Sequence, residues 1–246
     1  MSAPHFSLTR RADGRQSITV RQALLVWIGG WLAGNLIASS VQVATGHGRN
    51  ASAAPTWVTV LTALCLWVPM VGGMWALARS VGAPSFRKEF GAVWRPIDVI
   101  GLPIGVLSQL VVVRLVYVPL ESWWPHTFGR SRVERNARDL YDRAHGFWLL
   151  ALLVIVVVGA PLVEELVYRG LLQGAFRRRL NDIVAVVGVA AIFALVHFRP
   201  VEYPGLFVFG LILGTCAWRT ERLAMGFMAH LAFNATGLAL VAGALR

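Results

Sequence analysis

Residues 159–179, GAPLVEELVYRGLLQGAFRRR, place two adjacent carboxylates, Glu164 and Glu165, inside a long apolar run. An ionised carboxylate at the centre of a bilayer costs at least ~2.5 kcal/mol, so acids in such segments usually face a polar cavity and have a function. Arg169 lies four residues after Glu165, on the same helix face and in the favourable acid-before-base order. Glu164 points about 100° away and has no basic residue at its i+3 or i+4 position. The stretch therefore predicts a membrane helix in which Glu165 is paired and Glu164 is free for chemistry or for a partner on another helix.

The composition is that of a membrane protein. Of the 246 residues, 57% are hydrophobic and 14% are charged, whereas about 25% are charged in an average soluble domain; the mean hydropathy is +0.62. The net charge of +11 comes from basic residues scattered through short loops between apolar runs. The positive-inside rule explains such a distribution, and we expect no nucleic-acid partner.

Apolar runs near the ~20 residues that cross ~30 Å of hydrocarbon recur along the chain. They predict an all-α, polytopic transmembrane helix bundle of about seven spans, or six if the fifth and sixth runs are partly buried or re-entrant. The runs cover residues 23–44, 57–78, 97–120, 147–176, 183–198, 204–218 and 223–245.

Loop charges predict the orientation and a division of the chain. The loops 79–96, 177–182 and 219–222 are basic like the N-terminal tail, which places the N-terminus in the cytoplasm and the C-terminus outside. Ala51-Ser52-Ala53 resembles a signal-peptide cleavage site, but the preceding run of about 22 residues exceeds the usual ~7–15 of a signal core. We expect a cytoplasmic basic tail (1–22), N-terminal transmembrane helices and loops (23–146) and a catalytic transmembrane core (147–246).

Small residues in the apolar runs are expected to pack helices rather than to do chemistry. Cys65 and Cys216 lie in separate runs and predict neither a disulfide nor a thiolate metal site. Three Gly-x-x-x-Gly pairs permit close helix approach, and in a bundle of this size packing within the chain is favoured over dimerisation. The pairs begin at Gly30, Gly101 and Gly210.

Two further residue pairs at helical spacing bring polar side chains into the apolar runs, Phe193-x-x-x-His197 and His230-x-x-x-Asn234. Counted from a turn near Asn181 at ~1.5 Å per residue, Glu164 and His197 both lie ~25 Å along their helices. His230 and Asn234, counted from the loop before their helix, are ~12 and ~18 Å deep and come within reach after tilt. A carboxylate beside histidine can deprotonate water, and an imidazole with an amide can hold the oxyanion formed at a carbonyl. This is the equipment for peptide hydrolysis.

Glu164-Glu165-x-x-x-Arg169, Phe193-x-x-x-His197 and His230-x-x-x-Asn234, in this order on successive late helices, resemble the CPBP family of intramembrane proteases. This family includes CAAX prenyl endopeptidases and bacteriocin-processing proteins. The resemblance covers about residues 147–240, and each motif is weak alone but specific in combination.

The resemblance implies a role for each polar residue. Glu164 would be the general base, His197 would help to bind the water or a metal, and His230 with Asn234 would stabilise the oxyanion. Glu165 and Arg169 would brace the site. Glu164, His197 and His230 could also form a zinc triad with one open position, although the spacing is not His-Glu-x-x-His, so zinc and metal-free water activation both stay open.

The implied substrate is a hydrophobic or membrane-anchored peptide or protein, cut within the lipid bilayer. The compact chain points to a bacterial inner membrane, where a prenylated substrate would be doubtful. Two other functions are compatible with buried polar groups. The chain could be a non-catalytic scaffold or immunity protein whose polar groups hold helices together, or a proton-coupled transporter that uses Glu164 and His197 as a relay, although no inverted repeat is visible.

Overall fold

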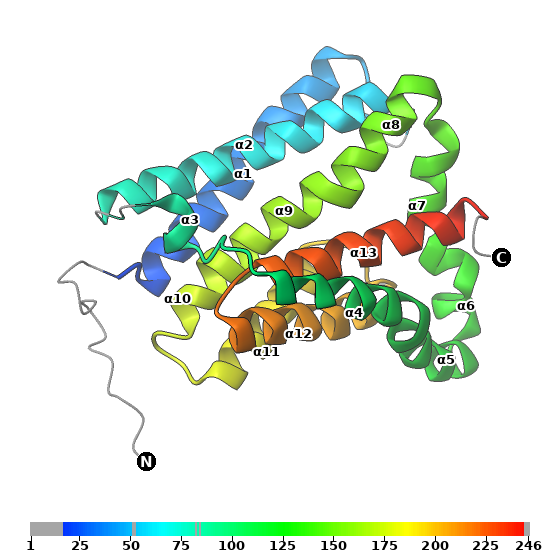
Figure 1. Ribbon diagram of the computed structural model, residues 1–246. Helices are drawn as coiled ribbons and strands as arrows, with labels where there is room; N and C mark the ends of the chain where they lie inside the picture. Colours follow the sequence, from blue (N-terminus) through cyan, green and yellow to red (C-terminus); the bar gives the residue numbers. More distant parts are fainter. Residues whose placement is uncertain (1–16, 51–52, 82, 84, 244–246) are drawn as a thin grey trace.

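A computed structural model describes residues 17–50, 53–81, 83 and 85–243, and in these ranges the chain forms helices and no strand. The predicted all-α polytopic bundle is confirmed (Figure 1). Most of the predicted basic tail, and Ala51 and Ser52 of the possible cleavage motif, lie outside the described residues.

The first two long helices form a hairpin, α1 (Val20–Ala44) and α2 (Thr56–Ser80). Thr19 and Gln22 begin α1 with reciprocal side-chain to backbone hydrogen bonds, which satisfy N–H groups that a helix start leaves open. A Cβ atom on Gly30 would lie 2.9 Å from the Met70 Cα. The first Gly-x-x-x-Gly pair is therefore used inside the chain, where it lets α1 and α2 touch along their backbones.

The third long helical segment, Pro96–Trp123, packs against α13 (Ala224–Val241). This segment is continuous and contains η2 (Pro96–Ile100), α4 (Gly101–Leu107), η3 (Ser108–Val112) and α5 (Val113–Trp123). Gly101 and Gly105 of this segment meet the backbone of α13, so the second glycine pair is also used within the chain. The short helices α3 (Phe86–Glu89) and α6 (Pro125–Phe128) flank the segment, and α7 (Arg130–Arg143) follows it.

The stretch with the two glutamates is one long helical segment between the α1–α2 hairpin and α13 (Figure 1). Two parts of it have π-helical hydrogen bonding, a geometry that often marks functional sites. Its parts are α8 (Gly146–Val154), the π-helical η4 (Ile155–Gly159), α9 (Ala160–Glu164), the π-helical η5 (Glu165–Gln173) and α10 (Gly174–Phe176).

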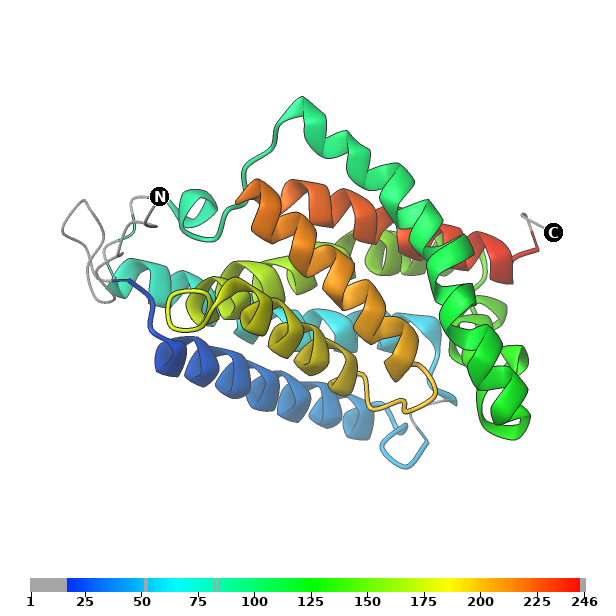
Figure 2. The same ribbon diagram turned by 90° about the horizontal axis from the view of Figure 1, so that it is seen from below.

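Two shorter helices complete the core, α11 (Asp182–Leu195) and α12 (Tyr203–Thr220). The Asn181 side chain caps α11 by accepting a hydrogen bond from the Val184 N–H at 2.8 Å. Viewed from below, α12 crosses the bundle between α11 and α13 (Figure 2). A Cβ atom on Gly210 would lie 3.1 Å from the Ala190 Cα, so the third glycine pair brings α12 against α11. All three pairs thus pack helices of this chain.

Five helical segments of the described chain are long and apolar enough to cross a membrane. The fifth and sixth apolar runs form α11 and α12, which do not meet these criteria; α11 has 14 residues. The expected helix over 183–198 is also shorter than predicted, because α11 ends at Leu195 and His197 lies in the turn beyond it. The segments that qualify are Val20–Ala44, Thr56–Ser80, Pro96–Trp123, Gly146–Phe176 and Ala224–Val241.

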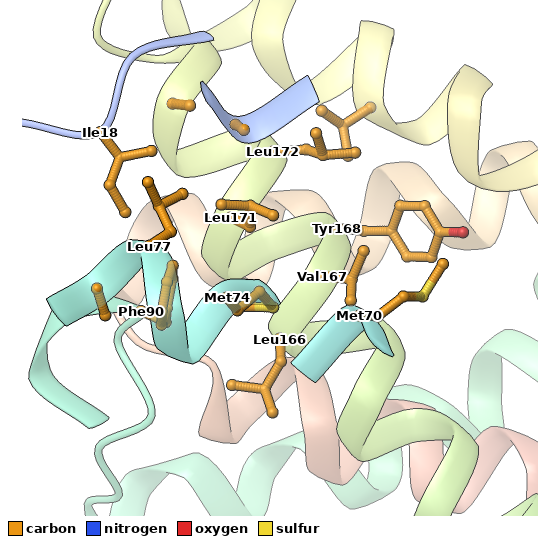
Figure 3. Close-up of a cluster of buried hydrophobic side chains, with 14 of the residues drawn as sticks. Ile18, Met70, Met74, Leu77, Phe90, Leu166, Val167, Tyr168, Leu171 and Leu172 are labelled. Carbon is orange, nitrogen blue, oxygen red and sulfur yellow. The ribbon is translucent and has the colours of Figure 1, made fainter. Parts of the chain in front are cut away.

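The largest apolar core joins the hairpin to the π-helical segment (Figure 3). Met70 and Met74 of α2 face Val167 and Leu171, and Phe90 packs beside Leu77 in the same cluster. This core fixes the segment that carries the two glutamates against α1 and α2.

Candidate active site

The innermost polar group is an ion pair between Glu165 and Arg169 on η5. Arg169 Nη1 donates to Glu165 Oε1 at 3.1 Å, and the two side chains are 1% exposed or less. Arg169 Nη2 donates in addition to the Gly210 carbonyl of α12 at 3.2 Å. Both charges are buried, and Arg169 contacts Glu165 of its own segment and Gly210 of α12. The ion pair therefore connects the π-helical segment to α12.

Gln173 lies one helical turn beyond Arg169, on the same face of η5. Its Nε2 donates to the Gly214 carbonyl at 2.8 Å, and Gly214 leaves room for the side chain because a Cβ there would lie 2.9 Å from Gln173 Oε1. The sequence analysis gave Gln173 no role. The signal was present, since Glu165, Arg169 and Gln173 recur at four-residue spacing on one face.

His230 of α13 lies between the two glutamates. Its Nδ1 is 3.1 Å from Glu165 Oε1, and its Nε2 is 3.6 Å from Glu164 Oε2. The imidazole is buried, whereas a quarter of the Glu164 side chain is exposed. His230 therefore links the buried ion pair to the more accessible carboxylate, a connection that the sequence analysis did not include for Glu165.

The cluster of Arg169, Glu165, Glu164 and His230 has no net charge when Glu164 and His230 share one proton, whichever of the two holds it. Arg169 neutralises Glu165, which leaves Glu164 and His230 to be either an ion pair or two neutral groups. Both states avoid an uncompensated charge in a buried site, which would be strongly unfavourable. A proton can consequently be held by Glu164 or by His230 without a change in the net charge of the cluster.

Aromatic rings hold the imidazoles in place. Phe193 of α11 meets His230 and His197 edge to face, with ring centroids 5.9 and 5.0 Å apart. Phe209 of α12 meets His230 in the same way at 5.3 Å, and the Arg169 guanidinium lies 4.6 Å from the centre of the Phe193 ring. Phe193 is thus a packing residue that positions three polar side chains.

His197 and Glu164 line the same cavity of about 190 Å³, whose other walls come from α1, α2, η5 and the end of α11. His197 Nδ1 is 2.7 Å from the Phe193 carbonyl oxygen. A carbonyl only accepts, so Nδ1 carries a proton and the neutral ring presents Nε2 as an acceptor. The structure therefore gives Glu164 and His197 a shared space in which a water could be bound by both.

Asn234 is engaged away from this cavity. Its Nδ2 donates to the Val156 carbonyl of η4 at 2.8 Å. In a π-helical register that carbonyl faces residue 161, and Pro161 has no N–H to donate. The Asn234 amide supplies the missing donor, so its clearest role in this structure is to stabilise the irregular helix that precedes the glutamates.

The proposed zinc ligands do not form a metal-binding group. Within residues 17–50, 53–81, 83 and 85–243, no three His, Cys, Asp or Glu side chains are arranged to hold a metal ion. His230 Nδ1 lies beside Glu165 and its Nε2 beside Glu164, while His197 Nδ1 lies beside the Phe193 carbonyl. Because Glu164, His197 and His230 do not fit a three-ligand catalytic zinc site, we derive no step through a metal.

These features define the class of protein, an all-helical integral membrane protein with an ionisable cluster built inside its bundle. Residues 146–236 match the family model described as type II CAAX prenyl endopeptidase Rce1-like. The matched range contains all three motifs, and the match confirms their resemblance to the CPBP/CAAX family of intramembrane proteases. No curated protein and no solved structure matches the chain.

Proposed function

We propose that this protein is an intramembrane endopeptidase in which Glu164 activates the attacking water. One observation carries the proposal: Glu164 is the member of the ionisable cluster that opens into the cavity shared with His197. Its neighbour Glu165 is fully buried and bound by Arg169 and His230. In this proposal Glu164 takes part in the reaction, and Glu165 holds Arg169 and His230 in position.

In the proposed reaction, water binds between the Glu164 carboxylate and His197 Nε2. Glu164 takes a proton as the water oxygen attacks the substrate carbonyl and a tetrahedral oxyanion forms. Protonated His230 can donate from Nε2 to this oxyanion, and the Asn234 amide hydrogen that Val156 does not take is a candidate second donor. When the C–N bond breaks, the proton on Glu164 passes to the leaving nitrogen, which gives a carboxylic acid and an amine; transfer of the acid proton to the amine then yields a carboxylate and an ammonium ion.

We propose hydrophobic or membrane-anchored peptides and proteins as substrates. The cavity lies beside the apolar core formed with α1 and α2, and Trp31, Trp67 and Met70 are among its walls. An apolar surface of this kind suits the hydrophobic part of a substrate that enters from the bilayer.

A Glu164→Gln comparison tests the function. We expect purified wild-type protein in proteoliposomes to generate new peptide termini in a detergent-solubilised membrane-protein fraction, detected by mass spectrometry. Glu164→Gln should lower the rate by about 10²–10⁴-fold, the usual contribution of a general base. The matched control is Glu221→Gln, an exposed glutamate at the end of α12.

The same experiment separates the alternatives. A scaffold would retain its partners in Glu164→Gln and produce no termini in either form. A transporter would show proton flux into the proteoliposomes that the variant loses, with no cleavage at all. Equal cleavage by wild type and Glu164→Gln would refute the role of Glu164.

A further inference from the structure

A second and larger cavity, of about 670 Å³, lies near the start of α2. Its walls come from the first turns of α2, one face of α7 and the segment 199–202 between α11 and α12. Its size is within the ~300–1,000 Å³ of ligand-binding pockets. Neither the catalytic residues nor the family motifs contribute to it.

The α7 wall of this cavity is basic. Arg132, Arg135, Asp139 and Arg143 recur at helical spacing and all line the cavity. Arg143 Nε donates to the Asp139 carbonyl at 2.7 Å. Among the described residues, the exposed Arg132 and Arg135 side chains have no ion-pair partner, so two guanidinium groups face the cavity without a carboxylate.

The opposite wall adds Arg199 and Glu202, whose side chains approach to 3.5 Å. Burial raises the pKa of the Glu202 carboxyl, an effect that the positive charge of Arg199 opposes. The lining as a whole has four arginines against two carboxylates, Asp139 and Glu202. This balance favours an anionic occupant.

The basic cavity adjoins the catalytic cavity. Thr62 of α2 lines the basic cavity, and Leu66, one helical turn further, lines the catalytic one. The chain makes a second connection, because His197 lines the catalytic cavity and Arg199 the basic one. From Thr62 in the basic cavity to Met70 in the catalytic one is eight residues of α2, so at ~1.5 Å per residue the two sites are roughly 12 Å apart.

We propose that the basic cavity binds an acidic segment of the peptide substrate. The proposal depends on the proposed proteolysis only for the identity of the occupant. An extended chain rises ~3.3 Å per residue, so the acidic residues would lie roughly three to four positions from the scissile bond. The walls favour a peptide over a phospholipid headgroup, because Asp139 and Glu202 can accept hydrogen bonds from peptide N–H groups, which a phosphodiester lacks.

Binding of two labelled peptides tests the site without requiring catalysis. Both probes have the same apolar half, and the other half is either four glutamates or four glutamines. We expect the full-length protein in nanodiscs to bind the glutamate probe at least about tenfold more tightly at low salt, measured by fluorescence anisotropy, since charge-assisted hydrogen bonds to arginine are strong. The preference should shrink as ionic strength rises.

Three variants locate the effect. Arg132→Glu with Arg135→Glu should abolish the preference, and the milder pair Arg132→Gln with Arg135→Gln should reduce it. Arg79→Glu makes the same charge change at the far end of α2 and should leave the preference intact. Glu164→Gln should also keep it, so loss of catalysis and loss of acidic-peptide binding are distinguishable.

Equal affinity for the two probes, or a preference that survives Arg132→Glu with Arg135→Glu in protein that elutes as wild type, overturns the proposal. A site for lipid would show a different result. Short-chain phosphatidylglycerol would then bind in a manner that requires Arg132 and Arg135, while the glutamate probe would not.

Discussion

The α1–α2 hairpin and the polar core around Glu165 are both helix–helix interfaces inside one bundle, and they are built on opposite principles. In the hairpin, Gly30 and Gly34 bring two backbones together with apolar side chains on either side. In the polar core, Arg169 and Gln173 reach from one helix to backbone carbonyls of another. The hairpin depends on close packing, whereas the core depends on the pairing of its buried charges.

This contrast explains where chemistry is possible. In an interface of packed apolar side chains, an ionisable group would have no hydrogen-bond or charge partner, and its burial would be unfavourable. An interface stabilised by balanced charges already holds a carboxylate and an imidazole away from water, and only small changes are needed to expose one of them. Glu164 is that exposed member, next in sequence to the carboxylate that holds the interface together.

Among the changes that test this comparison, Arg169→Met is expected to have the largest effect, a loss of stability of the polar core. The change leaves Glu165 buried without its cation, and removal of one partner of a buried pair costs about 3–5 kcal/mol. We expect a large loss of thermal stability in detergent and little correctly folded protein. Arg138→Met, which removes an exposed partner of Glu134, is the control and should change stability by about 1 kcal/mol or less.

A double variant would sharpen the first prediction. Arg169→Met combined with Glu165→Leu removes both charges and should recover part of the lost stability, although it cannot restore the hydrogen bond to Gly210. If Arg169→Met alone is as stable as wild type, the ion pair does not hold the core.

Gly34→Leu tests the other side of the comparison. A Cβ on Gly34 would already lie 2.8 Å from the Leu66 backbone, so a larger side chain must push α1 away from α2. Overpacking of this kind usually costs about 1–3 kcal/mol. Gly29→Leu is the matched control, because nothing lies within 4 Å of a Cβ there; equal losses in the two variants would show that close approach is not what stabilises the hairpin.

The polar core also has a glycine contact of its own, at Gly226 on α13. A Cβ there would lie 2.8 Å from Glu165 Oε2, on the carboxylate that His230 and Arg169 bind. Gly226→Ala should therefore disturb the position of Glu165 and His230, with a moderate fall in the cleavage rate and a smaller fall in stability. Gly188→Ala, with open space around its Cβ, should change neither.

Residue spacing predicted much of this core and missed the long-range parts. The Glu165–Arg169 pair follows from four-residue spacing. The depth count put Glu164 and His197 at one level, and both line one cavity in the structure. The donor that replaces the missing N–H of Pro161 comes from Asn234, and Asn234 lies 78 residues from the carbonyl that it serves. No local pattern encodes such a partner, because helix tilt and rotation decide it.

Sequence also could not place the end of α11. The apolar run continues to residue 198, so hydropathy extended the helix through His197. The structure ends it at Leu195, and Phe198 takes a left-handed φ of 52°. The turn frees His197 from the helix face and directs it into the cavity with Glu164.

Asn234→Leu is expected to have a smaller effect than the changes to the ion pair. It leaves the Val156 carbonyl without the amide donor, and an unsatisfied buried polar group costs about 1–3 kcal/mol. The cleavage rate should fall through disorder of the irregular helix, so a change in stability should accompany it. Loss of activity with unchanged stability would show instead that the main role of Asn234 is that of the second donor to the oxyanion.

The smallest expected effect is that of metal removal. His230 and His197 each have a ring nitrogen beside a protein oxygen, and the described residues do not gather three metal ligands. Dialysis against a zinc chelator should therefore leave the cleavage rate within about twofold, a change well below the 10²–10⁴-fold expected from the general base. Complete loss on chelation, with recovery on stoichiometric zinc, would require Glu164, His197 and His230 to rearrange around a metal, and the neutral cluster proposed here would then be a resting form.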